Sequence, residues 1–255
     1  MKKLFAGPFV GEFGHELFCY HGKIRRMAKE FDFTTVICTS GKEILYEDFA
    51  DEIIIYSPET YEPDCSVNKG ITQNFPTPDN TYNAYIPPNT QLIPLYDPEQ
   101  DFIPLGNGTS ELPYDYIFAA RQTNKINTGY RDWDPKKWDE LADKLIKSGK
   151  RIASIGLASM SYHVKGTDNL LDIPLKELAN IISSSNMVVG GSSGPMHFTT
   201  LCKTKHLVWS GDNIKINRLR YEDWWNPFKV EVLWIDAPEW NPTVEEIYNK
   251  IRNNE

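Results

Sequence analysis

Short apolar runs alternate with helical patterns along this chain of 255 residues, and this alternation limits the fold more than any other feature. The first series combines a helical pattern near residues 14–29 with apolar runs at 4–6, 35–38 and 53–56. Runs that are apolar on both faces and separated by helices are typical of parallel sheets covered on both sides. The chain is therefore expected to begin as a βαβαβ unit.

A second alternating series starts with an apolar run at residues 116–119. Its clearest element is a helix whose apolar side chains recur three and four residues apart from Trp138 to Ile146. Asp134 supplies the cap of this helix, and Pro135 is suited to its first position. Further strands are predicted at 152–155, 187–189, 207–209 and 230–235, and further helices at 175–182, from Pro195 and after Thr243.

Proline separates the two series. Residues 57–113 hold 10 of the 17 prolines, and each proline lacks a backbone donor and has a fixed torsion angle. Because aromatic and aliphatic residues are interspersed, we expect this section to pack on the first half, with a hinge near Gly106 to Pro113. The predicted domains are 1–112, which includes the proline-rich section 57–112, and 113–255.

The predicted fold class is α/β, with two Rossmann-like domains that face each other across a cleft and parallel sheets covered by helices. Ligands of such sheets bind beyond the carboxyl ends of the strands. The last helix starts with a capping-box pattern of Thr243 and Glu246. It is a candidate for packing back on the first domain.

The formal charge of −8 opposes a function in which a basic surface binds nucleic acid. A small phosphate-bearing ligand remains possible, since it needs only a few local donors. The chain shows neither a signal-peptide pattern nor an apolar stretch of transmembrane length, so a cytoplasmic protein is expected. The four cysteines contain no Cys-x-x-Cys pair, which gives no support for a disulfide framework or a zinc site.

The strongest local motif is the stretch from Val188 to His197, in which an apolar strand enters a Gly/Ser loop. Pro195 then opens a helix, whose first N–H groups and positive dipole end favour an anion. Ser192 and Ser193 add hydroxyl donors to this loop. The alternative is a plain strand-to-helix turn, and the spacing alone favours neither.

The loop after the first apolar run carries two carboxylates and an imidazole. Its glycine spacing fits neither a dinucleotide fingerprint nor a Walker loop. Glu12 and Glu16 are one helical turn apart, so repulsion or burial would raise one pKa and make a proton acceptor, with His15 between them. Alternatively, both acids complement the dipole of the first helix.

Basic residues near strand ends are candidates for phosphate binding. Arg121 follows the run at 116–119, and an arginine there can pair with a phosphate through two bonds, although a surface ion pair explains it equally well. The weaker candidates are Arg131, Lys165, Arg218 and Arg220. Asp132-Trp133-Asp134 has the form of a metal-binding Asp-x-Asp, but Asp134 is better explained as a helix cap, and no metal site is predicted.

Two of these segments resemble a known family. Residues 190–197, followed by Leu201 and a strand at 206–209, resemble the nucleotide-sugar loop of GT-B glycosyltransferases, most closely the family 9 heptosyltransferase-like group. Ser192 stands where many members carry Asp. Gly11-Glu12-Phe13-Gly14 resembles the acceptor loop of that family, and Glu12 takes the place of its catalytic carboxylate.

The resemblance implies an inverting transfer of a sugar from a nucleotide-diphosphate donor, with no essential metal and no cofactor. The acceptor, whether glycan, lipid-linked or protein, is not specified. Glu12 is the expected base, with Glu16 or His15 as replacements. The implied donor-binding residues are Gly11, Arg121, Arg131, Lys165, Ser192, Ser193, Gly194, Pro195, Met196 and His197.

Two other functions fit the same residues. A nucleotide-sugar 2-epimerase would hold a diphosphate in the same way, and a non-catalytic nucleotide- or sugar-binding module would need only the second loop. The aromatic segment of Trp224 and Trp225 could line a donor pocket, but packing in the core is the favoured interpretation.

Overall fold

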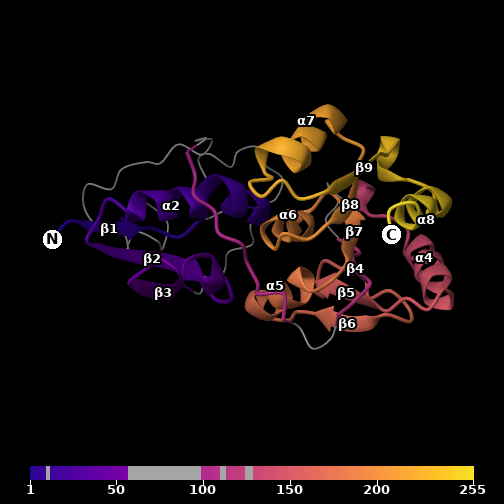
Figure 1. Ribbon diagram of the computed structural model, residues 1–255, viewed down its shortest axis with the longest axis horizontal. Coiled ribbons are helices and arrows are strands. Elements are labelled where there is room, and N and C mark those ends of the chain that lie inside the picture. The colour runs from indigo at the N-terminus through magenta and orange to yellow at the C-terminus, as the bar shows by residue number, and fades with distance from the viewer. Residues whose placement is uncertain (10–11, 57–98, 110–112, 124–128) are drawn as a thin grey trace. The chain divides into compact units, whose positions relative to one another are not determined.

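The computed structural model describes residues 1–9, 12–56, 99–109, 113–123 and 129–255. The chain forms two compact units, Met1–Ile103 and Pro104–Glu255 (Figure 1). The boundary therefore precedes the predicted one at 112/113. The Leu105 N–H donates to the carbonyl of Leu201 at 2.8 Å, and a Cβ on Gly106 would lie 2.3 Å from the carbonyl oxygen of Ala179. These contacts attach the start of the predicted hinge to the second unit.

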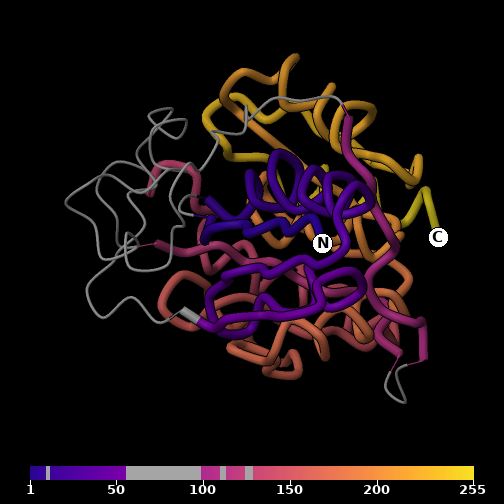
Figure 2. Tube along the Cα trace, turned by 90° about the vertical axis from the view of Figure 1, so that its left-hand side faces the viewer, coloured from indigo at the N-terminus to yellow at the C-terminus, as the bar shows by residue number. Residues whose placement is uncertain are grey.

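The first unit contains three parallel strands in the order β1 (Lys3–Ala6), β2 (Phe33–Thr39) and β3 (Glu52–Tyr56). Its trace can be followed from indigo to purple in Figure 2. All three strands match predicted runs. The connection from β2 to β3 contains a 3-10 turn, η2 (Glu43–Leu45), where the βαβαβ prediction expected a helix. The proline-rich residues 57–98 lie outside the described part of the chain.

The predicted first helix is built of three consecutive segments, namely α1 (Phe13–His15), the π-helical η1 (Glu16–Tyr20) and α2 (His21–Ala28). Leu17 and Ile24 are fully buried. Arg25 is also buried and attaches α2 to the β2–β3 connection. Its guanidinium donates twice to the Asp48 carboxylate, at 2.8 Å each, and once to the Leu45 carbonyl at 3.0 Å.

The second unit contains a six-stranded parallel sheet in the order β6-β5-β4-β7-β8-β9. The strands are β4 (Tyr116–Ala119), β5 (Ile152–Gly156), β6 (Asp168–Leu171), β7 (Met187–Gly191), β8 (His206–Ser210) and β9 (Val232–Asp236). The predicted strands are confirmed. β6 was missed because this edge strand is polar at its start and lies exposed or half-buried along its length.

Helices cover both faces of this sheet (Figure 1). On one face lie α4 (Pro135–Lys147) and α8 (Val244–Arg252), and on the other α5 (Leu175–Ser183) and α6 (Gly194–Leu201). Asp134 caps α4 by accepting from the Lys136 N–H at 2.9 Å, and Thr243 with Glu246 forms the predicted capping box of α8. Trp138 of α4 contacts Trp133 and Trp209, and the three rings form a buried aromatic cluster between the helix and β8.

The apolar face of α8 packs inside the second unit. Its apolar residues Val244, Ile247 and Ile251 enter the core of the second unit, where α8 lies beside α4. This apolar face is therefore used within its own unit, and the predicted packing of the helix on the first domain stays a prediction. Among the described residues, none of the helices has the length and apolar character needed to cross a membrane.

Candidate functional site

The Gly/Ser loop lies where β7 ends and α6 begins, at the carboxyl edge of the second sheet. Glycine is needed at positions 190 and 191 because neighbouring atoms leave little room for a Cβ. A Cβ on Gly190 would lie 2.8 Å from the Met196 sulfur and 3.0 Å from the Ala119 carbonyl oxygen. A Cβ on Gly191 would lie 3.2 Å from the Trp209 indole nitrogen. The glycines thus let α6 and the neighbouring strands approach this loop closely.

Ser193 occupies the N-cap position of α6 with an extended backbone, φ −163° and ψ 170°, but its side chain makes no cap hydrogen bond. An N-cap serine normally accepts from an N–H of the first turn. Its hydroxyl oxygen is buried, and within the described part of the chain it has no hydrogen-bond partner. This hydroxyl and the positive end of α6 are therefore available to an anion.

Tyr221 lies beside this loop and was missed by the sequence analysis. It comes from the π-helical η5 (Arg220–Trp224), which follows α7 (Ile214–Leu219). Its hydroxyl is 3.3 Å from the Ser192 hydroxyl, the Ser193 nitrogen and the His197 Nε2. Burial raises the pKa of Tyr221 well above its usual value, so the phenol stays protonated.

The only sequence signal for Tyr221 was the aromatic segment around Trp224 and Trp225. Trp225 does lie against the site, with its ring edge-on to His197 at 4.9 Å, whereas Trp224 is exposed. The imidazole of His197 also stacks on Tyr221, with ring centres 4.4 Å apart. Trp225 therefore packs against the loop, and the lining of a donor pocket by this segment stays a prediction.

Arg131 supports the loop from the other side. It belongs to η4 (Gly129–Arg131), and its Nη2 donates to the Ser192 carbonyl at 2.5 Å. Its guanidinium lies 4.5 Å above the ring of Trp240. The Nε is buried and has no hydrogen-bond partner among the residues that the structure describes. Arg131 therefore brings positive charge directly to the loop, and its predicted contact with a phosphate stays a prediction.

Arg121 follows β4, next to β7, but its guanidinium forms an ion pair with Asp132. The second oxygen of Asp132 accepts from the Thr123 N–H at 2.7 Å. Desolvation raises the pKa of Asp132, although the Thr123 N–H and Arg121 both favour its charged form. The ion-pair alternative for Arg121 is thus the one observed. Asp134 caps α4, and the described ranges contain no group of His, Cys, Asp and Glu side chains that could hold a metal.

The other predicted basic residues lie in different surroundings. Lys165 is highly exposed, and its ammonium pairs with Asp139 of α4 at 3.3 Å. The contacts that the structure gives it are with α4, so its predicted place in the anion site gains no support and stays a prediction. Arg218 pairs with Glu222 at 2.9 Å, and Arg220 lies 4.9 Å above the Trp225 ring.

In the first unit, Glu12 and Glu16 have opposite environments. Glu12 is the N-cap residue of α1, with a half-exposed carboxylate 3.7 Å from His15 Nδ1. Glu16 is 1% exposed, accepts from the Tyr46 hydroxyl at 2.9 Å and forms an ion pair with Lys42. Glu16 is therefore part of the core, which disfavours its predicted role as a replacement base. Gly11 lies outside the described residues.

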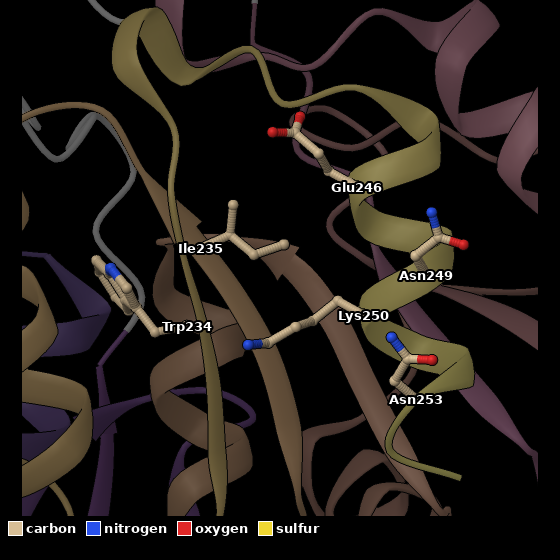
Figure 3. A pocket seen from close by; sticks show the side chains of 6 residues that line it. All are labelled: Trp234, Ile235, Glu246, Asn249, Lys250 and Asn253. Atoms are coloured by element: carbon tan, nitrogen blue, oxygen red, sulfur yellow. The ribbon is translucent and has the colours of Figure 1, made fainter.

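A separate surface hollow lies between β9 and α8 (Figure 3). It is lined by Trp234, Ile235, Glu246, Asn249, Lys250 and Asn253. None of these residues comes from the β7–α6 loop, η4 or η5. The loop, unlike the residues that line this hollow, combines buried donors with the positive charge of Arg131, so the loop is the better candidate for a functional site.

Comparisons with family models and with curated proteins give no match. Solved structures do match, and they decide the architecture. The chain has the fold of the family 9 glycosyltransferases. A glycosyl transferase family 9 protein from Veillonella parvula DSM 2008 aligns with a TM-score of 0.62 at 10% identity, over 99% of this chain and 96% of that one.

Two Escherichia coli structures support the same fold. The ADP-heptose lps heptosyltransferase II aligns with a TM-score of 0.60 at 13% identity, over 99% of this chain and 98% of the other. The heptosyltransferase WaaC with ADP aligns with a TM-score of 0.50 at 11% identity, over 100% and 98%. The predicted α/β class, with parallel sheets covered by helices in the GT-B manner, is confirmed.

Proposed function

We propose that this chain is a glycosyltransferase whose second unit binds the diphosphate of a nucleotide-sugar donor. The observation that carries the proposal is the uncapped N-terminus of α6. There the buried Ser193 hydroxyl is without a partner in the described structure, and Arg131 contacts the adjoining peptide. The shared fold supports the proposal, because the WaaC structure named above holds ADP.

The diphosphate would accept from the Ser193 hydroxyl and from N–H groups of the first turn of α6. Pro195 has no N–H, so the donors available there are those of Gly194 and Met196. Arg131 adds charge without leaving its contact with Ser192. Positive groups fixed in place would stabilise the departing diphosphate, which is the part a metal ion plays in other transferases. We propose a metal-independent reaction on this basis.

Glu12 is the proposed base. It would take the proton of an acceptor hydroxyl, whose oxygen then attacks the anomeric carbon on the face opposite the diphosphate. The bond from that carbon to the diphosphate oxygen breaks, and the nucleoside diphosphate leaves with the electron pair. This displacement inverts the anomeric centre. His15, at 3.7 Å from Glu12, would hold the carboxylate in place. The predicted cytoplasmic location remains a prediction.

The donor site is tested by calorimetry with ADP, UDP, GDP and inorganic pyrophosphate. The native chain should bind pyrophosphate and at least one nucleotide. Ser193→Ala should weaken diphosphate binding by roughly 10- to 100-fold, because a hydrogen bond to a charged group contributes about 1.5–3 kcal/mol. Ser148→Ala, at the exposed end of α4, is the matched control and should bind as the native chain does. Absence of binding by the native chain would refute the proposed function.

The proposed base is tested with Glu12→Gln. This variant should bind the donor normally while transfer falls by roughly 10²- to 10⁴-fold, the usual effect of losing a general base. Transfer is measured by release of nucleoside diphosphate with candidate acceptors. Undiminished transfer would remove Glu12 from the mechanism. Epimerised donor formed without an acceptor would identify a 2-epimerase, and donor binding without any reaction would identify a binding module.

A further inference from the structure

The hydroxyl of Tyr221 is equidistant from three polar groups of the β7–α6 loop. It lies 3.3 Å from the Ser192 hydroxyl, the Ser193 nitrogen and the His197 Nε2. Tyr221 itself is 1% exposed, so its hydroxyl is held away from water. A buried phenol needs hydrogen-bond partners in the protein, because leaving it unpaired lowers the stability of the fold by about 1–3 kcal/mol. Here every one of those groups belongs to the loop and to the first turns of α6.

The hydrogen-bonding capacity of the phenol determines which of these three groups donate to it and which accept from it. A phenol donates one proton and accepts through two lone pairs. The Ser193 N–H donates to it, and its own proton goes to the Ser192 hydroxyl. The second lone pair can then accept from His197 when Nε2 carries the proton. All three loop groups are thereby bonded to one residue.

The side chains of Ser192 and Ser193 differ in their hydrogen bonds. The Ser193 N–H is used by Tyr221, whereas the Ser192 hydroxyl accepts the phenol proton and keeps its own proton. The Ser193 hydroxyl has no such contact and stays buried without a partner in the described ranges. The Ser192 carbonyl is held in turn by Arg131. The loop is thus held on two sides, by Tyr221 and by Arg131.

We infer that Tyr221 is a positioning residue for diphosphate binding. This role rests on the proposed function. The η5 segment fixes the orientation of the Ser193 peptide, so that the Ser193 hydroxyl and the Gly194 N–H point at the phosphate. Ser192 contributes to the same network by accepting the phenol proton. The stacked His197 ring keeps the phenol in this position, with the two ring planes inclined by 11°.

The first test is Tyr221→Phe, which keeps the stacked ring and removes only the hydroxyl. Calorimetry should show that binding of pyrophosphate and of the preferred nucleoside diphosphate falls about 5- to 10-fold, as expected for loss of one ordinary hydrogen bond. Binding of the corresponding nucleoside should not change. Tyr162→Phe is the matched control, because that hydroxyl bonds to Asp139 of α4.

The second test is a double-mutant cycle in the same assay. If Tyr221 acts by positioning Ser193, then Ser193→Ala should weaken pyrophosphate binding clearly less in the Tyr221→Phe background than in the native chain. A tyrosine that merely stabilises the fold would leave the effect of Ser193→Ala the same in both backgrounds. Should Tyr221→Phe fail to fold, Ser192→Ala removes the partner of the phenol proton and should show the same loss.

The outcomes separate this inference from the function on which it rests. A native chain that binds no diphosphate refutes both. A native chain that binds diphosphate, with Tyr221→Phe and Ser192→Ala binding equally well, overturns the role of Tyr221 and leaves the donor site intact. Selective loss of diphosphate affinity, together with the non-additive cycle, supports the inference.

Discussion

Two glutamates four residues apart show how strongly the surroundings decide the role of a side chain. Glu12 stays half-exposed beside His15, whereas Glu16 is buried between Lys42 and Tyr46. The spacing correctly placed both near the start of the first helix. It gave no means of telling which carboxylate faces solvent, because the partners of Glu16 lie 26 and 30 residues further along the chain.

Glu16→Gln should therefore affect stability and leave donor binding unchanged. The substitution leaves the Lys42 ammonium without its counter-charge, and breaking a buried pair in this way destabilises by about 3 kcal/mol. Urea unfolding should show this loss, while pyrophosphate affinity stays at the native value. Glu12→Gln is the comparison variant and should unfold as the native chain does. A Glu16→Gln variant of native stability would contradict the structural role given to this carboxylate.

Helix starts are the elements that were predicted most accurately, since their signals are local. Asp134 and Pro135 mark the first turn of α4, and Thr243 with Glu246 marks that of α8. Elements without local signals were missed, among them β6 and the π-helical η5. β6 forms because β5 offers a hydrogen-bonding edge, which its own polar sequence does not reveal. η5 matters most, because it carries Tyr221 to the loop.

The cap of α4 can be tested directly. Asp134→Ala removes the acceptor for the Lys136 N–H and should destabilise the second unit by about 1 kcal/mol. Asp143→Ala serves as the control on the same helix, because Asp143 makes only an exposed pair with Lys147, and such pairs contribute about 0.3–0.5 kcal/mol. Chemical denaturation of both variants measures the difference. A smaller loss for Asp134→Ala than for Asp143→Ala would argue against the cap.

At the scale of the whole molecule, both units carry a buried histidine whose charged form is disfavoured. Desolvation lowers the pKa of His21 to about 3 and that of His206 to about 4. The unfolded chain has ordinary histidines that titrate near pH 6.5, so below that pH it binds more protons than the folded chain. Stability is therefore fully present above about pH 6.5 and is lost as the pH falls toward the folded values.

The expected slope is up to about 1.4 kcal/mol per pH unit for each histidine. Denaturation between pH 7.5 and 5 measures this slope. In that range the carboxyl groups whose pKa is lowered, such as that of Asp168 beside Arg151, do not yet titrate. His206→Gln should flatten the profile of the second unit and leave that of the first unchanged. Constant stability over this range would contradict the burial of both histidines as neutral groups.

The sequence by itself determined the α/β class, most strands, the helix caps and the position of the Gly/Ser loop. These features depend on apolar periodicity and on side chains that bond to their own backbone neighbours, so a short window contains them. Only the tertiary structure decided that Glu16 is buried, that Arg121 pairs with Asp132 and that the Tyr221 hydroxyl contacts the loop. Ser192 and Tyr221 are 29 residues apart in sequence, and the strand order of the sheet brings them together. Such contacts depend on how distant segments pack, which no local pattern encodes.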